Sequence, residues 1–472
     1  MDTKALRQKI LDLAIHGKLV PQDPNDEPAS VLLERIRAKK ERLIKEGKIK
    51  KGKKSAKTSD KPHYPYELPK GWKWCKLGDI AYVGTGATPL TTCKYYYENG
   101  NIAWINSSST KVPFIAKASN FITRKAIEET NCLVYPKGTL VIAMYGEGKT
   151  RGQISELLID AATNQACAAV CPYFEATKEY LKLFFEGNYL HIRALAEGGN
   201  QPNLSLGKIQ NYEIPLPPLD EQKRILEQAK KLLLQVENIE KEKEKNKNSI
   251  KQAKAKILNL AIHGKLVPHD LNDEPASELL RRINPKAEII SDNGHYQNLP
   301  KGWCLTTLES ITNYGSCVNV SVQEIPKDAW VLELEDIEKD SAKILCARHK
   351  KDREIKGVRH RFKAGDILYS KLRTYLNKVL IAPNEGFCTT EIIPISVKLG
   401  IHNKYICHVL RSQAFLDYTA QCGYGVKMPR LSTKDAQNGI IPLPPYNEQL
   451  RIVSMVEKLL ADLGTIEESL AR

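Results

Sequence analysis

The chain contains 472 residues, 42% of them hydrophobic, and its 71 Lys and Arg against 55 Asp and Glu give a formal net charge of +16. No apolar run approaches the roughly 18 residues that a membrane span needs, and the N-terminal MDTKALRQKI lacks a signal-peptide core. Eleven cysteines without a CxxC pair are typical of a reducing compartment. These features argue against a membrane or secreted protein and predict a soluble, cytoplasmic chain of two to four domains.

One sequence frame occurs twice. Ile10–Pro21 reads ILDLAIHGKLVP, and Ile257–Pro268 reads ILNLAIHGKLVP. The same short motifs follow in both halves: NDEPAS at 25–30 and 272–277, LPKGW at 68–72 and 299–303, and IPLPP with a Glu-Gln pair at 214–222 and 441–449. The blocks between them, 73–213 and 304–440, share little sequence. A duplicated frame around two different inserts predicts pseudo-two-fold symmetry and two readers for a ligand with two half-sites, for which DNA is the obvious candidate.

The first 61 residues are expected to form a helical segment and a basic tether. Residues 37–61 hold 12 Lys and Arg against 3 Asp and Glu. Such a low-complexity run is either a flexible, solvated linker or a segment with affinity for phosphates.

The first insert reads as a mixed α/β domain. Strand-like segments are expected at 101–105, 138–144 and 168–170, and a helix at 177–195. Cys167 and Cys171 lack the further ligands that would complete a zinc site, so we interpret them as buried thiols. Ala143–Thr150 reads AMYGEGKT, which resembles a relaxed phosphate-binding loop, but Ala143 replaces the required glycine and Arg151-Gly152 interrupts the helix that should follow. Close approach to a DNA backbone is the favoured interpretation.

From Leu219 the chain carries a heptad seam over five heptads, interrupted only by Lys243 and Asn246. At ~1.5 Å per residue, the helix predicted from Asp220 to Gly264 is roughly 65 Å long and needs a partner helix. The C-terminal segment continues the same seam and stops where the N-terminal segment resumes it, which predicts that the two ends meet and together form the partner. The predicted seam residues are Ile225, Leu232, Val236, Ile239, Ile250 and Ile257, then Ile452, Leu459, Leu463 and Ile466, and at the N-terminus Leu6, Ile10 and Leu13.

The second insert also reads as mixed α/β, with strands expected at 330–334, 366–369 and 392–397 and a helix at 403–421. Residues 348–378 hold 11 Lys and Arg against 3 Asp and Glu, and the strand within this run indicates a folded basic surface. The fold class expected is α+β: two mixed α/β domains separated by a long antiparallel two-helix coiled coil in a circular arrangement. The predicted segments are 1–61, 62–218, 219–295, 296–445 and 446–472.

At this point the chain resembles a known family, the specificity subunits of type I restriction–modification systems. The resemblance rests on IPLPP-x-x-EQ with its heptad helix, the AIHGKLVPQDPNDEPAS block, LPKGW, GDILYSKLRTYL at Gly365–Leu376, GNQPNLS at Gly199–Ser205 and VKMPRLS at Val426–Ser432. It implies that each insert is a target recognition domain reading one half of an asymmetric DNA site. It also implies that the helices set the spacing and dock methyltransferase subunits, two of them, and through these the restriction subunits. S-adenosylmethionine, ATP and Mg²⁺ would be used by those partners, with no cofactor, metal or catalytic residue in this chain.

Reading DNA requires Arg and Lys for phosphates and guanine, and Asn and Gln for adenine. A second hypothesis, of a different class, is a self-contained DNA-dependent enzyme that binds nucleotide at Ala143–Thr150. For any single candidate, a solvated or structural role is the alternative. The candidate DNA-binding residues are Lys94, Tyr95, Asn106, Lys149, Arg151, Gln201 and Asn203 in the first insert, and Arg359, Arg361, Lys371, Arg373, Tyr375, Lys378, Lys427 and Arg430 in the second.

Overall fold

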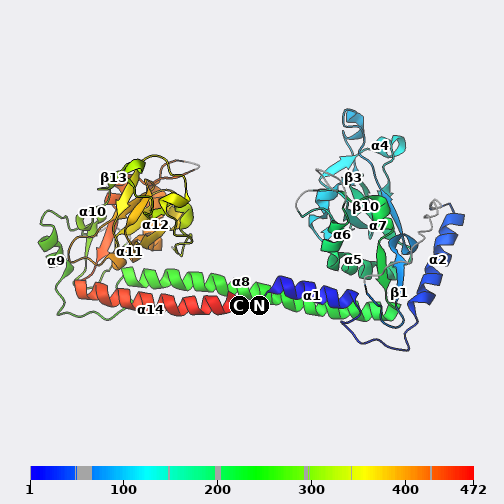
Figure 1. Cartoon of the computed structure of the whole chain (residues 1–472), viewed down its shortest axis with the longest axis horizontal. Coiled ribbons are helices and arrows are strands. Elements are labelled where there is room, and N and C mark those ends of the chain that lie inside the picture. Colours follow the sequence, from blue (N-terminus) through cyan, green and yellow to red (C-terminus); the bar gives the residue numbers. More distant parts are fainter. Residues whose placement is uncertain are drawn as a thin grey trace. The chain divides into compact units, whose positions relative to one another are not determined.

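A computed structural model describes residues 2–47, 49, 66–146, 149–196, 203–291, 296, 298–341, 343–425 and 428–471. The chain divides into an N-terminal unit, Asp2–Glu242, and a C-terminal unit, Lys243–Arg472. The division falls within one continuous helix, α8 (Leu219–Ile262, 44 residues), whose predicted bounds are confirmed to within two residues (Figure 1). At ~1.5 Å per residue this helix is about 66 Å long. The fold class is confirmed: two sheet-rich, mixed α/β units and a long helix.

In the N-terminal unit, helix α1 (Thr3–Ile15) packs along the first half of α8 (Figure 1). Leu11, Ala14 and Ile15 share one buried cluster with Ile225 and Ala229 of α8. The two helices run antiparallel, since Arg7 lies 3.9 Å from Glu237 and 3.7 Å from Glu240, while Gln22 beyond α1 donates to Glu221 at the start of α8.

In the C-terminal unit, helix α14 (Tyr446–Ala471) packs along the second half of α8. Ile452 and Val456 share a buried cluster with Leu258 and Ile262, and an ion pair of 2.5 Å joins Lys254 to Glu467, so these helices are also antiparallel. The predicted meeting of the two chain ends involves both units and stays a prediction. Of the predicted seam residues, Ile10, Ile225, Val236, Ile250 and Ile452 are buried, Leu6, Leu13, Leu232, Ile239, Ile257, Leu459 and Leu463 are partly buried, and Ile466 is 49% exposed.

In the residues of the first insert that the structure describes, the strands form three sheets; we call this insert the N-terminal reader and the second insert the C-terminal reader. The five-stranded sheet has the order β2-β10-β7-β8-β4, in which β7 lies between β8 and β10 and pairs antiparallel with both. All four residues of β7 are buried, which explains why this strand reads as a continuous apolar run. The strands are β1 (Lys73–Lys76) with β11 (Glu213–Leu216); β2 (Ala81–Thr85), β10 (Cys167–Pro172), β7 (Leu140–Ala143), β8 (Ile154–Leu157) and β4 (Phe114–Ile115); and β5 (Asn120–Ile122), β3 (Ile102–Ile105), β9 (Ala161–Thr163) and β6 (Val134–Tyr135).

The C-terminal reader has a related core. Its three-stranded sheet β17-β16-β19 places an antiparallel hairpin, β16–β17, beside β19, as β7–β8 lies beside β10. Two inserts with little common sequence therefore share a buried hairpin and its neighbouring strand. The strands are β12 (Cys304–Thr307) with β20 (Ile440–Leu443); β17 (Val379–Ile381), β16 (Ile367–Ser370) and β19 (Ile392–Ile395); and β13 (Val318–Val320), β15 (Arg359–Phe362), β18 (Gly386–Thr389) and β14 (Val331–Leu332).

The long helices predicted in each insert are wrong as single elements. In the first, α5 (Lys178–Gly187) is followed after Asn188 by α6 (Tyr189–Ala194). In the second, α11 (Asn403–Arg411) stops at Ser412, whose extended backbone and hydroxyl cap the next helix, α12 (Gln413–Cys422). The remaining helices are α2 (Ala29–Lys45), α3 (Leu77–Ile80), α4 (Arg124–Glu129), α7 (Leu206–Gln210), α9 (Ala276–Ile283), α10 (Leu308–Ile311) and α13 (Thr433–Gln437). Helix α2 continues to Lys45, well into the basic run, and most of the rest of that run lies outside the described residues.

The repeated motifs form the same contacts in both units, and we call each set a frame. In the N-terminal frame, buried Glu221 accepts from the indole N–H of Trp72 (2.9 Å) and from Gln22 (3.2 Å). In the C-terminal frame, buried Glu448 accepts from the indole N–H of Trp303 (3.1 Å) and lies 2.7 Å from His269 Nδ1. Burial raises the pKa of Glu221, and the hydrogen bonds from Gln22 and Trp72 act in the opposite direction. The repeated Glu is therefore the joint between each LPKGW segment and the start of a long helix.

The other repeated residues support this joint in matching positions. Gln222 donates to Pro217 O at 2.9 Å, and Gln449 donates to Pro444 O at 3.1 Å. Arg224 pairs with Asp26 and Arg451 with Asp273, which lowers the pKa of Asp273 mainly through its hydrogen bond to Arg451. The frame thus explains why NDEPAS, LPKGW and IPLPP-x-x-EQ, far apart in the sequence, are repeated together: they are in contact.

Candidate nucleic-acid interface

In the C-terminal unit, three segments meet where strand β16 ends. Lys371 N donates to Glu391 O (3.0 Å), and Leu431 N donates to Lys371 O (2.9 Å). Arg373 N also donates to Pro429 O (2.8 Å). The structure therefore brings together the GDILYSKLRTYL and VKMPRLS motifs, which are more than fifty residues apart in the sequence. We call this place the C-terminal loop junction.

The N-terminal unit contains the same junction. Met144 N donates to Ala166 O (2.8 Å), and Leu204 N donates to Met144 O (3.0 Å). The hairpin loop is further held by α6, because Tyr189 donates to Lys149 O (2.5 Å) and Arg193 to Arg151 O (3.0 Å). These bonds fix the backbone of two predicted DNA-binding residues.

The same loop decides the nucleotide-binding alternative. After Lys149 the chain turns through Gly152, which has a φ of +84°, and enters β8 at Ile154. No helix follows Lys149-Thr150 in this described stretch, although a phosphate loop needs one to direct its N-terminus at the phosphates. From Lys149 to Gln153 the chain forms a turn that leads into β8, not a helix.

The predicted DNA-binding residues of the first insert that the structure describes lie in three places. Lys149 is exposed and Arg151 partly buried in the loop, with half-buried Asn203 beside Leu204 in the closing segment. Lys94 and Tyr95 lie exposed on a 3-10 turn (Lys94–Tyr96), where Lys125 Nζ stands 4.5 Å from the Tyr95 ring centroid. Asn106 follows β3 and caps the next turn by accepting from Ser108, so its carbonyl oxygen is already engaged. Gln201 lies outside the described residues.

In the second insert, the side chains of two predicted DNA-binding residues already form hydrogen bonds within the protein. Arg359 is buried and donates to Glu333 (2.9 Å) and to Lys356 O (2.7 Å). Lys378 donates to Leu334 O (2.6 Å), and burial lowers its pKa. We therefore leave Arg359 and Lys378 out of the interface proposed below.

The remaining predicted residues of this insert that the structure describes are exposed or partly buried. Arg361 is exposed and lies 3.4 Å from Glu385. Arg430 forms a forked pair with Glu391, with bonds of 3.0 to 3.3 Å, which ties the closing segment to the entry of β19. Lys371 and Arg373 are partly buried in the loop, and Tyr375 is 59% exposed. Lys427 lies outside the described residues.

The loop between β16 and β17, residues 371–378, which we call the C-terminal loop, has an unusual backbone conformation that was not predicted from the sequence. Arg373 has φ +51° and ψ +58°, and Asn377 has φ +49° and ψ +48°, so both lie in the left-handed region on either side of the 3-10 turn Thr374–Leu376. This conformation costs a non-glycine residue about 1–3 kcal/mol and persists only where surrounding contacts impose it. No sequence signal predicted it at Arg373, since Asn but not Arg is enriched in that region.

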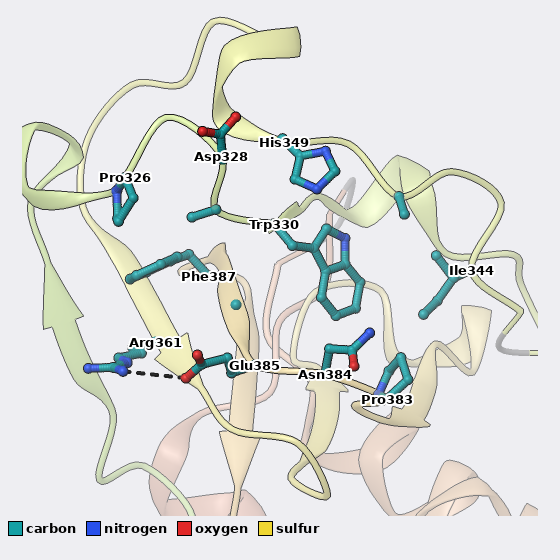
Figure 2. A pocket seen from close by; sticks show the side chains of 13 residues that line it. Pro326, Asp328, Trp330, Ile344, His349, Arg361, Pro383, Asn384, Glu385 and Phe387 are labelled. Atoms are coloured by element: carbon teal, nitrogen blue, oxygen red, sulfur yellow. Dashed lines mark hydrogen bonds and ion pairs between the residues drawn. The ribbon is translucent and has the colours of Figure 1, made fainter.

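A cavity of about 620 Å³ lies beside the four-stranded sheet of the C-terminal reader (Figure 2). Its lining includes Trp330, Phe387 and His349, and also the ion pair between Arg361 and Glu385 (Figure 2). The indole N–H of Trp330 is buried and has no partner in the part of the chain that the structure describes.

No group of three or more His, Cys, Asp or Glu in the described part of the chain could hold a metal ion. Of the two thiols predicted to be buried, Cys167 is buried, which raises its pKa to about 12. Cys171 is only partly buried, and burial raises its pKa as well. Among the same residues, no helix is long and apolar enough to cross a membrane.

Two sheet-rich units, each with a loop junction and each with the same frame at the start of a long helix, define a duplicated, modular protein. A model of the family described as the type I restriction modification DNA specificity domain matches residues 69–251 and 350–471, more than half of the chain. The chain belongs to this family, the specificity subunits of type I restriction–modification systems, which are DNA-recognition components.

Individual relatives are distant in sequence but match along most of their length. The chain is 28% identical to the EcoAI specificity subunit of Escherichia coli, over 97% of this chain and 89% of that protein. It is 26% identical to the EcoEI specificity subunit of the same species, over 96% and 88%. A solved structure titled for the complex assembly and conformational transition of the type I R-M system matches with a TM-score of 0.57 at 18% identity, over 86% of this chain and 94% of that one. This last similarity concerns the fold alone.

Proposed function

We propose that this chain is the non-catalytic, sequence-specific DNA-binding subunit of a type I restriction–modification complex, and that each reader recognises one half of a bipartite, asymmetric site. The readers are the proposed recognition domains 62–218 and 296–445. The observation that carries the proposal is the loop junction, in which two matching backbone bonds occur in both units but the side chains differ. A common scaffold that presents different residues is suited to two different half-sites.

The frames give a physical reason for a fixed spacing between half-sites. Each frame joins its reader to the start of a long helix, α8 in the N-terminal unit and α14 in the C-terminal unit, through a buried Glu and an ion pair, Arg224–Asp26 or Arg451–Asp273. Because α8 is one continuous helix shared by both units, its length rather than the readers would set the gap.

The proposed interface combines residues for phosphates and residues for bases. Lys149 and Lys371 are the best placed for phosphates, because their positive charges lie on the hairpin loops; Arg361, exposed on β15 beside Glu385, is a further candidate. Tyr95, Asn203 and Tyr375 carry no charge and suit base edges.

The resemblance to known systems supports the remaining parts of the proposal. Two methyltransferase subunits would dock on the helical segments and carry restriction subunits with them. S-adenosylmethionine, ATP and Mg²⁺ would be bound by those partners, in the cytoplasm.

Comparing DNA methylation in cells with and without this gene, by sequencing that detects methylated adenine, tests the proposal. We expect one bipartite motif, two short specific halves around a fixed nonspecific gap, to lose methylation when the gene is deleted. Methylation that is the same with and without the gene, in cells shown to express the partner subunits, would contradict the proposed function.

A further inference from the structure

The turn at the tip of the C-terminal loop is rigid although it projects a large side chain. Leu376 N donates to Arg373 O and Asn377 N to Thr374 O, both at 2.9 Å, which closes the turn. The left-handed residues Arg373 and Asn377 stand at its two ends. Such a conformation is retained where tertiary contacts impose it, and it is concentrated at sites that bind ligands.

Both ends of the turn are clamped to separate segments. At the first end, Arg373 N donates to Pro429 O of the closing segment. At the second end, the Asn377 amide donates to Arg411 O at the end of α11 (3.2 Å), while Asp340 N donates to Leu376 O (3.1 Å). Arg411 in turn donates to Asp340 O (2.7 Å), which links these two contacts. The conformation of the turn is therefore preorganised by contacts within the protein, without a ligand.

The side chain that this clamp projects is Tyr375, which is 59% exposed at the centre of the turn. Lys371 and Arg373 precede it, and no Asp or Glu occurs from residue 367 to residue 384; acidic residues beside the loop include Asp340, whose backbone contacts the turn, and Glu391, which pairs with Arg430. A tyrosine offers a flat apolar face and a hydroxyl that can donate and accept, and it loses little entropy on binding. It adds nothing to phosphate neutralisation.

We infer that Tyr375 contacts a base pair in the half-site read by the C-terminal unit, and that Arg373 and Asn377 are positioning residues for it; this rests on the proposed function. The neighbouring cations would hold the phosphates while the tyrosine ring and hydroxyl meet a base edge in duplex DNA. The alternative, in which Tyr375 docks a protein subunit, makes different predictions in the same experiment.

The test uses the full chain assembled with the methyltransferase subunits of its own system. The methylated motif is first determined for the wild type, and a failure to find a bipartite motif at that stage would count against the proposed function, not against Tyr375. For Tyr375→Ala, we expect one position in one half of the motif to become degenerate. Affinity for a duplex with the wild-type motif should fall about 5- to 150-fold, the range for one base contact. Affinity for random duplex and its salt dependence should not change, because no charge is removed.

Two further sets of variants separate the roles. Tyr375→Phe retains the ring, so its motif shows whether the hydroxyl reads the base. Asn377→Gly and Asn377→Val both remove the bond to Arg411, but only glycine tolerates a positive φ; we expect valine, and not glycine, to relax the motif. Leu399→Ala is the control, since Leu399 is 93% exposed and follows β19 at the opposite end from the loop.

Two results would overturn the inference. One is a Tyr375→Ala complex with the wild-type motif and affinity. The other is a loss of methylation accompanied by equal losses on random duplex, or by loss of a methyltransferase subunit from the complex, which would assign Tyr375 to general binding, folding or assembly. Loss of methylation with unchanged assembly and unchanged affinity for random duplex would support it.

Discussion

Replacing Gly264 with alanine tests whether the frame is a tightly packed joint. Gly264 follows the end of α8 with a φ of +63°, and a Cβ at this position would overlap the Pro300 ring and lie 3.1 Å from the Trp303 ring. Pro300 and Trp303 belong to the repeated LPKGW motif, and Trp303 donates to Glu448. The added methyl group therefore pushes on the joint itself.

The expected loss of stability has two parts. A left-handed backbone costs an L-residue about 1–2 kcal/mol, and overpacking a fitted site costs about 1–3 kcal/mol. The sum is about 2–5 kcal/mol, and for units of this size each 1 kcal/mol lowers the melting temperature by roughly 2–4 °C. Gly264→Ala should therefore lower the melting temperature of the C-terminal unit by roughly 4–20 °C. Gly17→Ala, whose Cβ would lie 2.5 Å from Pro69, should have a similar effect on the N-terminal unit.

Gly464→Ala is the matched control, because Gly464 lies inside helix α14 and a Cβ there meets nothing within 4 Å. Alanine in place of a helical glycine should stabilise by about 1 kcal/mol. Thermal unfolding followed by circular dichroism measures all three variants. The close packing of the frame is refuted if Gly264→Ala has the same melting temperature as the wild type, or if Gly464→Ala lowers the melting temperature as much as Gly264→Ala does.

Three other predictions concern charge and length. Burial lowers the pKa of His408 to about 3, so the contribution of its neutral imidazole to the free energy of unfolding is complete above the unfolded pKa of about 6.5 and is lost as pH falls toward 3. His408→Leu should therefore reduce the slope of unfolding free energy against pH by up to about 1.4 kcal/mol per pH unit in urea titrations from pH 7 to 4. Equal slopes for the variant and the wild type would contradict this prediction. Lys371→Ala should weaken binding to all duplexes and lower the salt slope by about 0.9; an unchanged isotherm at several salt concentrations would exclude Lys371 from the interface. Four residues inserted near Lys243 and four near Leu470 lengthen each helix by ~6 Å, so an active variant should methylate sites with a gap one or two base pairs longer, and the original gap would show that the helices do not set the spacing.

The sequence predicted the repeated parts of this protein well, because their constraints are local or periodic. The heptad seam predicted α8 to within two residues at each end, since an apolar stripe at that spacing is stable only as a helix. Apolar runs likewise predicted β7 and β16 as strands, with small differences in their ends. The helix breaks at Asn188 and Ser412 were missed because both residues are tolerated within helices when tertiary contacts favour it.

The contacts between distant segments could not be predicted. Nothing local indicates that Glu221 and Trp72 form one joint, although their repetition as Glu448 and Trp303 was a signal that they act together. The ion pair between Arg359 and Glu333 could not be predicted either. In a basic stretch of sequence, an arginine that is buried and paired cannot be distinguished from one that is exposed and able to bind DNA. The sequence located the basic hairpin loops, and only the structure separated their free side chains from the structural ones.

The central claim, that each reader recognises its own half-site through an interchangeable position on a common frame, is tested most directly by copying one reader into both positions. Residues 62–218 would be replaced by 296–445 of the same chain, since both segments include LPKGW and end at the IPLPP prolines. The methylated motif of the resulting complex is then determined by sequencing. We predict a symmetric motif in which the second half-site occurs twice, in opposite orientations, with the gap unchanged. A correctly folded, active complex that still methylates the original asymmetric motif, or a motif unrelated to either half, would contradict the claim.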